Sequence, residues 1–249
     1  MSLNWASDFS YSYFKRILQT GKSKFELHQF REAPQTIERF KTQAVGGRPL
    51  LFLRHDVDVS LKRAMIMANI EKDLGIGATY MVMTESSLYR VEDDTSFGLL
   101  RKIIDMGHEI GLHINPRTHK PHSLEAKIDS GCRKLENVTG APVKTVSFHR
   151  PRKKDQHGPL MIGNRVNAYA KELQRSYLSD SGGRWRDGEP LPELLRFHEP
   201  LLQLLIHPIW WGYEHMQAKE RLKTFVIEET GGSELRDKII EMIGVEFDF

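Results

Sequence analysis

The sequence predicts an α/β protein whose parallel strands curl into a distorted (β/α) barrel. From Pro49 onward, short apolar runs alternate with helical patterns, and this alternation requires parallel strand pairing with right-handed crossovers. An open doubly wound sheet and a (β/α) barrel both meet that requirement. No glycine-rich dinucleotide fingerprint or phosphate-binding loop follows the first strand, and this favours the barrel.

The first β-α-β unit begins with "PLLFLRHDVD", residues 49–58, whose apolar run is typical of a strand buried on both faces. A helix is expected over residues 60–75, because its apolar residues recur at helical spacing and Gly75 provides a C-terminal stop. The next strand is expected in "GATYMVM", residues 77–83, and the next helix in "SFGLLRKIIDMG", residues 96–107.

The alternation continues to residue 211. We expect strands in "HEIGLHI", "PVKTVSFHRP", "SYLSDS" and "LLQLLIHPIWW", and helices at about Ser123–Val138 and Asn164–Arg175. Residues 1–48 are interpreted as an N-terminal extension with one helix and an edge strand in "KFELHQF". Residues 212–249 are interpreted as two helices separated by a break at Thr230–Ser233.

Composition predicts one folded domain over residues 1–249. The 39% hydrophobic and 28% charged content excludes a disordered or membrane class. A net charge of +3, with both signs mixed along the chain, argues against a nucleic-acid partner. No segment is apolar over the length of a membrane span, no signal peptide begins the chain, and Cys132 is the single cysteine. We therefore expect a cytoplasmic protein.

Histidines occur where several predicted strands end. The carboxyl ends of parallel strands lie on one side of a barrel, so these side chains are expected to converge at one mouth, together with nearby aspartates. Carboxylate and imidazole are the ligands of catalytic divalent metals. The residues concerned are His55, His113, His149 and His207, with Asp56, Asp58 and Asp180.

Asp56 and Asp58 are two residues apart, so on a strand both carboxylates point to the same face. They would repel each other unless a cation or a proton relieved the repulsion. If one carboxylate binds a metal, the other remains free as a base. This arrangement suits metal-assisted hydrolysis, in which the ion polarises a carbonyl and a water while the second carboxylate removes the proton of the water.

Five motifs in this order resemble those of the polysaccharide deacetylases, the NodB-like or carbohydrate esterase 4 superfamily. They are "HDVD", "GHEIGLH", "FHRP", "SDSGGRW" and "LLIHP", within residues 50–211. The wording "RHDVD", "SFHRP" and "HPxWW" is most similar to the WbmS-like branch, which is associated with O-antigen biosynthesis. The resemblance implies a single domain of the deacetylase barrel type, with residues 49–211 as the motif-bearing part.

The resemblance also implies chemistry, namely hydrolysis of an N-acyl group from an amino sugar by a divalent ion, usually zinc. By this resemblance Asp56 is the base, Asp58 a metal ligand and His113 the first metal histidine. Arg150 matches the arginine that orients the base, and His207 matches the acid that protonates the leaving amine.

The third metal ligand departs from the family pattern. Arg117 occupies the position where the second metal histidine is expected. Because catalytic zinc sites have three protein ligands, we looked for a substitute and found His149 and His119. His149 is preferred because it lies at a predicted strand end, whereas His119 lies in a loop between prolines. A decayed site with no third ligand remains the alternative.

Four further residues are expected to contact the sugar, because they lie in loops after strands or have flat aromatic faces. A basic run, "RPRKKDQHGP", is most simply a solvated loop, but it could also grip the diphosphate of a nucleotide- or lipid-linked sugar. The four expected substrate-binding residues are Asp180, Trp185, Trp210 and Trp211.

The leading hypothesis is a metal-dependent hydrolase that removes an acetyl or formyl group from an amino sugar during surface polysaccharide assembly. The alternative is a catalytically inactive barrel of the same type that binds a sugar or a partner protein. The two differ in whether metal is bound and an amine is released.

Overall fold

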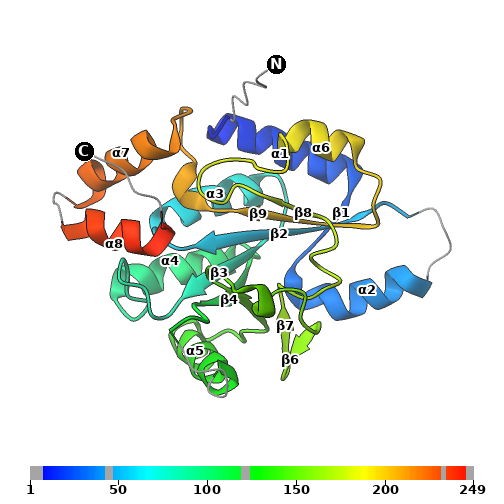
Figure 1. The fold of residues 1–249 in the computed structure, drawn as a ribbon, viewed down its shortest axis with the longest axis horizontal. Helices are drawn as coiled ribbons and strands as arrows, with labels where there is room; N and C mark the ends of the chain where they lie inside the picture. The colour runs from blue at the N-terminus through cyan, green and yellow to red at the C-terminus, as the bar shows by residue number, and fades with distance from the viewer. Residues whose placement is uncertain (1–7, 43–46, 119–123, 231–233, 245–249) are drawn as a thin grey trace.

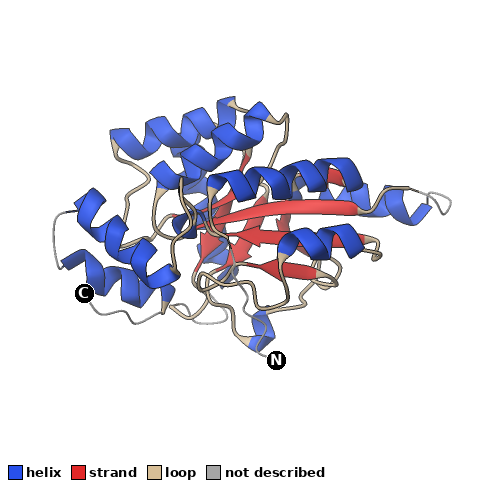
Figure 2. Ribbon diagram, turned by 90° about the horizontal axis from the view of Figure 1, so that it is seen from above, coloured by secondary structure: helices blue, strands red, loops and turns tan. Residues whose placement is uncertain are grey.

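In the computed structural model, a curled sheet of nine strands occupies the centre of the molecule and helices surround it (Figures 1 and 2). The structure describes residues 8–42, 47–118, 124–230 and 234–244. The strand order is β6-β7-β5-β4-β3-β2-β9-β8, with β1 beside the first half of β2. Within the described ranges, only the β6–β7 pair is antiparallel. The strands are β1 (Glu26–His28), β2 (Leu50–Val57), β3 (Thr79–Met83), β4 (Glu109–Ile114), β5 (Thr145–Phe148), β6 (Met161–Ile162), β7 (Arg165–Asn167), β8 (Tyr177–Ser179) and β9 (Leu201–Ile206).

Side-chain caps set where several helices begin. Ser60 accepts a hydrogen bond from the Arg63 amide at the start of α3, and Asp93 accepts one from the Ser96 amide at the start of α4. The helices are α1 (Tyr11–Lys24), α2 (Ala33–Thr42), α3 (Leu61–Asp73), α4 (Asp94–Asp105), α5 (Leu124–Thr139), α6 (Pro190–Arg196), α7 (Ala218–Thr230) and α8 (Glu234–Ile243). Sequence reasoning did not predict α6.

The distorted (β/α) barrel predicted from the sequence is confirmed. Consecutive strands β2 to β5 are joined by helices and pair in parallel, while β6 and β8 form the two outer ends of the strand order. The sheet is therefore open among the described residues. Figure 1 shows β2 pointing toward the end of the molecule where α7 and α8 lie. None of the helices in the described ranges is both long and apolar enough to span a bilayer.

The two faces of the sheet bury different side chains, because successive residues of a strand point in opposite directions. On β2, Leu51 and Leu53 join the large core that packs beneath α3, α4 and α5. Leu50 and Phe52 join a smaller apolar cluster inside the curl. Arg54 and the two aspartates after it continue this inner row toward the carboxyl end of the sheet.

The segment before β2 closes the amino end of the curl. Phe30, Ala33 and Ile37 come from the 3₁₀ helix Phe30–Glu32 and from α2, and all belong to the inner apolar cluster. Buried Glu109 on β4 holds this segment by accepting a hydrogen bond from the Arg31 amide. The predicted strand in "KFELHQF" is present as β1. This segment therefore covers the amino ends of the central strands.

The helix expected at Asn164–Arg175 is wrong. A tight turn at Gly163, with φ of 58°, joins β6 and β7 into an antiparallel pair, and β7 then pairs with β5 in parallel. Residues 168–175 form turns instead of a helix. The apolar spacing of this segment resembled a helix, but Val166, Ala168 and Ala170 are buried inside the curl, so tertiary packing overrides local preference.

Candidate metal centre

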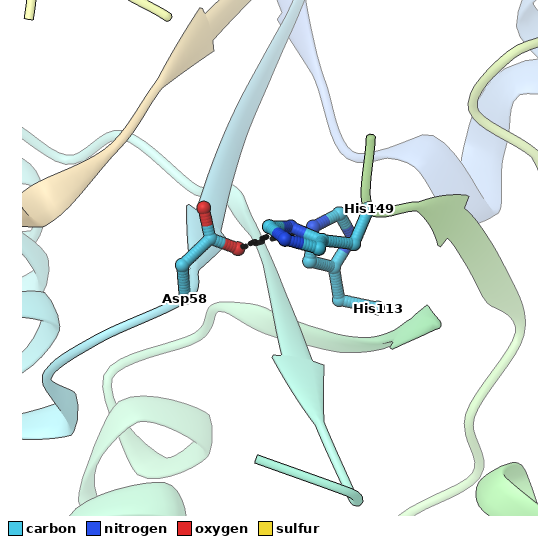
Figure 3. Close-up of side chains that lie close together, drawn as sticks. All are labelled: Asp58, His113 and His149. Carbon is cyan, nitrogen blue, oxygen red and sulfur yellow. Dashed lines mark ion pairs between the residues drawn. The ribbon is translucent and has the colours of Figure 1, made fainter. Parts of the chain in front are cut away.

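Three buried side chains converge at the carboxyl ends of β2, β4 and β5. The Nε2 atom of His113 and the Nδ1 atom of His149 each lie 3.2 Å from the same oxygen of Asp58, Oδ1 (Figure 3). One possible ligand atom from each residue lies within 4.8 Å of the others. The structure thus brings together the three residues predicted as metal ligands. His119, the other candidate, lies outside the described residues.

Hydrogen bonds behind the two rings determine which nitrogen faces Asp58. His113 Nδ1 lies 2.7 Å from Ser147 Oγ on β5, which leaves Nε2 toward the carboxylate. His149 Nε2 donates to the carbonyl oxygen of Met242 at 2.8 Å, which leaves Nδ1 toward the carboxylate. Such outer contacts orient metal-binding histidines and select their tautomer.

The surroundings of the Asp58 carboxylate suit a group that binds a cation. Its Oδ1 atom is buried and faces two imidazole nitrogens, His113 Nε2 and His149 Nδ1, each 3.2 Å away. Burial alone would raise the pKa of Asp58, but His149 and His113 outweigh it and the pKa is well below the usual range. An ionised buried carboxylate with two imidazoles is a suitable ligand set for a divalent ion.

Asp56 has a different partner. Arg54 holds both of its oxygens, with Nε 2.7 Å from Oδ1 and Nη2 2.7 Å from Oδ2. Burial raises the pKa of Asp56, but the charge of Arg54 outweighs it, so the pKa is lowered and the carboxylate stays ionised. Its Oδ2 atom also lies 3.5 Å from His113 Nε2, next to the metal cluster.

The family resemblance implies that Arg150 orients Asp56, and this is wrong. The guanidinium on Asp56 belongs to Arg54, which is completely buried, donates to Gln203 on β9 and lies 4.7 Å from the centre of the Tyr169 ring. Arg150 instead donates to the carbonyl of Glu241 in α8. The spacing of residues 54 and 56 on one strand contained the signal, because alternate residues share a face.

His207 follows β9 and is held by Asp180. The imidazole Nδ1 lies 2.6 Å from Asp180 Oδ1, and the backbone amide of His207 donates to both oxygens of the same carboxylate. Burial lowers the pKa of His207, but Asp180 outweighs it and raises the pKa to about 9. The free Nε2 lies 3.9 Å from Asp58 Oδ2. A protonated imidazole therefore borders the metal cluster.

The residues expected to contact the sugar have other roles. Asp180 is completely buried against His207 and Trp211, whose indole N–H donates to it at 2.9 Å. Trp185, Trp210 and Trp211 are at most 5% exposed, so none offers a ring face to solvent. The predicted substrate-binding roles are therefore wrong, since these four side chains support His207 and the core.

Gly183 follows Asp180 in the turn after β8, and its close neighbours are protein atoms. Its φ is +68°, and a Cβ there would lie 2.4 Å from Ala218 Cβ and 3.1 Å from the Trp210 ring. The glycine is needed because the start of α7 and Trp210 pack directly onto this turn.

His55 does not join the mouth. It lies on the opposite face of β2 from Arg54 and Asp56, where its Nε2 is 2.5 Å from Glu71 of α3 and its ring stacks on Tyr80. Glu71 also accepts a hydrogen bond from the Tyr80 hydroxyl at 2.7 Å. The expected convergence of four histidines is thus correct for His113, His149 and His207 only, because strand alternation turns His55 away.

A cavity of about 200 Å³ opens beside the two metal-site histidines. Arg117, which replaces the expected metal histidine, lies exposed next to it and donates from Nε to the Arg150 carbonyl at 2.9 Å. It therefore links the loops after β4 and β5 instead of offering a ligand. The cavity is lined by Met83, Thr84, Glu85, Ser87, His113, Ile114, Asn115, Thr118, His149, Arg150, Glu241 and Met242.

Comparisons with known proteins yield similar solved structures only. No protein-family model matches the chain, and no curated protein matches it. Similar structures include a family 4 carbohydrate esterase from Bacillus anthracis, at 18% identity over 80% of this chain and 78% of that one, with a TM-score of 0.42. The Streptococcus pyogenes deacetylase PplD in complex with acetate is 13% identical over 86% and 85%, with a TM-score of 0.44. BA3943, described as a CE4 family pseudoenzyme from Bacillus anthracis, is 14% identical over 78% and 64%, with a TM-score of 0.42. Likeness at this level leaves activity open, so a functional conclusion depends on the site itself.

Proposed function

We propose that this protein is a metal-dependent carbohydrate N-deacylase, which hydrolyses an acetyl or formyl group from an amino sugar. The observation that carries the proposal is the convergence of Asp58, His113 and His149 beside an ionised carboxylate, Asp56, and a protonated imidazole, His207. Amide hydrolysis needs a base for the attacking water and an acid for the leaving amine, and this site offers one of each next to a three-ligand cluster.

Each residue has one role in the proposed cycle. Asp58, His113 and His149 would hold a divalent ion, which would supply Lewis acidity for the hydrolysis. Asp56, which Arg54 keeps ionised, removes a proton from that water. His207, which Asp180 keeps protonated below a pKa of about 9, donates a proton to the departing amine nitrogen.

The proposal includes membership of the polysaccharide deacetylase superfamily, in the WbmS-like branch. Its support is the ordered set of five sequence motifs, of which four contain residues of the cluster or of its two flanking groups. The reaction would then belong to O-antigen or other surface polysaccharide biosynthesis on the cytoplasmic side. Zinc fits a site with three protein ligands and an open position, although Asp and His suit other divalent ions as well.

We propose a nucleotide- or lipid-linked sugar as the substrate form. Lys153 and Lys154 are exposed in the 3₁₀ helix that follows the His149 loop, where they could meet a diphosphate. Arg152, also considered for this role, is engaged by Asp155, with Nε 2.7 Å from Oδ2. Lys153 and Lys154 are therefore the residues proposed to contact a diphosphate.

The experiment that tests the activity is a screen for amine release from N-acetyl and N-formyl amino sugars, free and diphosphate-linked, with wild type and Asp56→Asn. We expect turnover in the wild type and a loss of at least about 10²-fold in the variant, because the base is removed while the metal ligands remain. Metal content should be equal in both proteins. Full activity of Asp56→Asn would contradict the assignment of the base.

The inactive-barrel alternative makes the opposite prediction in the same experiment. It expects sugar binding without bound metal and no amine release from any substrate. The buried, ionised Asp58 facing two imidazole nitrogens supports the active form over this alternative.

A further inference from the structure

The carboxyl end of α8 contacts the two residues that follow β5, His149 and Arg150. Figure 1 shows α8 at the end of the molecule toward which β2 points. The Met242 carbonyl accepts a hydrogen bond from His149 Nε2 at 2.8 Å, and the Glu241 carbonyl accepts one from Arg150 Nη1 at 3.1 Å. Both carbonyls belong to the last turn of the helix, where backbone oxygens have no partner within the helix. Two neighbouring residues after β5 therefore satisfy the free end of α8.

The contact with His149 determines the state of a proposed metal ligand. A carbonyl oxygen can only accept, so the proton of a neutral His149 must lie on Nε2. Nδ1 is then left with its lone pair toward Asp58 Oδ1, 3.2 Å away. The negative end of the helix dipole also favours the positive charge that accumulates on an imidazole bound to a cation.

Gly244 allows this close approach. It ends α8 with a φ of +65°, and its amide donates to the Ile240 carbonyl at 2.8 Å. A Cβ at this position would lie 3.0 Å from Nη2 and 3.1 Å from Cζ of Arg150. The missing side chain therefore lets the end of the helix lie against the loop that carries His149.

We propose that the carboxyl end of α8 is a positioning element of the metal centre, which holds His149 in the tautomer that binds a cation. The proposal rests on the function proposed above. Because coupling between two equilibria is reciprocal, metal binding should in turn stabilise the last turn of α8. Met242 of α8 lies 93 residues after His149 in the sequence.

The test is the dissociation constant of Co²⁺, measured by chelator competition and by the visible absorption of the bound ion, in wild type and Gly244→Ala. We expect Co²⁺ binding to weaken about 10- to 100-fold in the variant, as for the loss of other outer-shell contacts to metal histidines. The matched control is Gly140→Ala. Gly140 ends α5 with a φ of +68°, and a Cβ there would lie 3.2 Å from Arg101 Nη1. Gly140 precedes β5, so it lies at the amino end of the sheet, away from the candidate metal centre.

The outcomes separate this inference from the function on which it rests. Equal Co²⁺ affinity in Gly244→Ala and Gly140→Ala, with normal binding by wild type, would overturn the role of α8 and leave the proposed function standing. Absence of Co²⁺ binding by wild type would overturn both.

Hydrogen exchange provides a second test, which uses the wild-type protein alone and does not depend on the folding of a variant. Hydrogen exchange of the Gly244 amide should slow when Co²⁺ is added, whereas exchange of the Gly140 amide, which donates to the Glu136 carbonyl at 2.8 Å, should not change. The same effect on both amides would indicate general stabilisation and would overturn the specific coupling.

Discussion

At the scale of single residues, Asp56 and Asp58 lie two positions apart yet have different chemistry, because different groups face them. Arg54 donates to both oxygens of Asp56, whereas Oδ1 of Asp58 faces two imidazole nitrogens, each 3.2 Å away. Asp56 is therefore suited to accept a proton, and Asp58 is suited to bind a cation. His207 completes the set as a protonated donor.

The pKa of His207 gives a pH-dependent prediction. Asp180 raises this pKa to about 9, so the acid is protonated at neutral pH and is lost as the pH rises through about 9. In Asp180→Asn the raising charge is absent, so the pKa falls and the alkaline limb of the pH profile of kcat should move to lower pH. An alkaline limb at the same pH in both proteins would show that His207 is not the acid.

Arg54 gives a prediction with the opposite sign. Its charge lowers the pKa of Asp56, so Arg54→Lys, which retains a charge but loses the two-pronged contact, should raise that pKa and move the acid limb of the profile to higher pH. Since the base also loses its orientation, kcat should fall by about 10²-fold. An unchanged profile would assign the orientation of Asp56 to another group.

At the scale of elements, β2 was predictable because an uninterrupted apolar run specifies a buried parallel strand without further information. The structure of residues 164–175 was not predictable, because their spacing indicated a helix. Burial of Val166 and Ala168 inside the curl and the turn at Gly163 produce a strand and turns instead. On the outer face of β2, α3 is joined to the sheet by a buried polar group. Glu71 is completely buried and contacts both His55 and Tyr80.

Removal of Glu71 tests this element. Glu71→Ala leaves His55 and Tyr80 without their buried partner, so the free energy of unfolding should fall by about 3–5 kcal/mol in urea denaturation. Glu92→Ala is the control, because Glu92 pairs with Lys134 at the surface and should contribute about 0.5 kcal/mol or less. Equal effects of the two changes would mean that the buried contact does not hold α3 in place.

At the scale of the whole molecule, the convergence of Asp58, His113 and His149 was predictable because parallel strands bring their carboxyl ends together. Strand ends indicated His113 and His149, whereas the choice of Asp58 over Asp56 as a ligand came from the family resemblance. Pairings that depend on side-chain direction were not predictable, such as Arg54 with Asp56 or Asp180 with His207. The contact of α8 with His149 was not predictable either, since it joins segments 93 residues apart in sequence.

The most direct test of the account is the metal content of the protein, measured by mass spectrometry after purification without a histidine tag or added metal. Wild type and His198→Ala, which changes an exposed histidine away from the site, should contain nearly one equivalent of a divalent ion. Asp58→Ala and His149→Ala should lose most of it, since two ligands hold such an ion poorly. Equal metal in all four proteins, or none in wild type even after metal is added, would contradict the proposed centre.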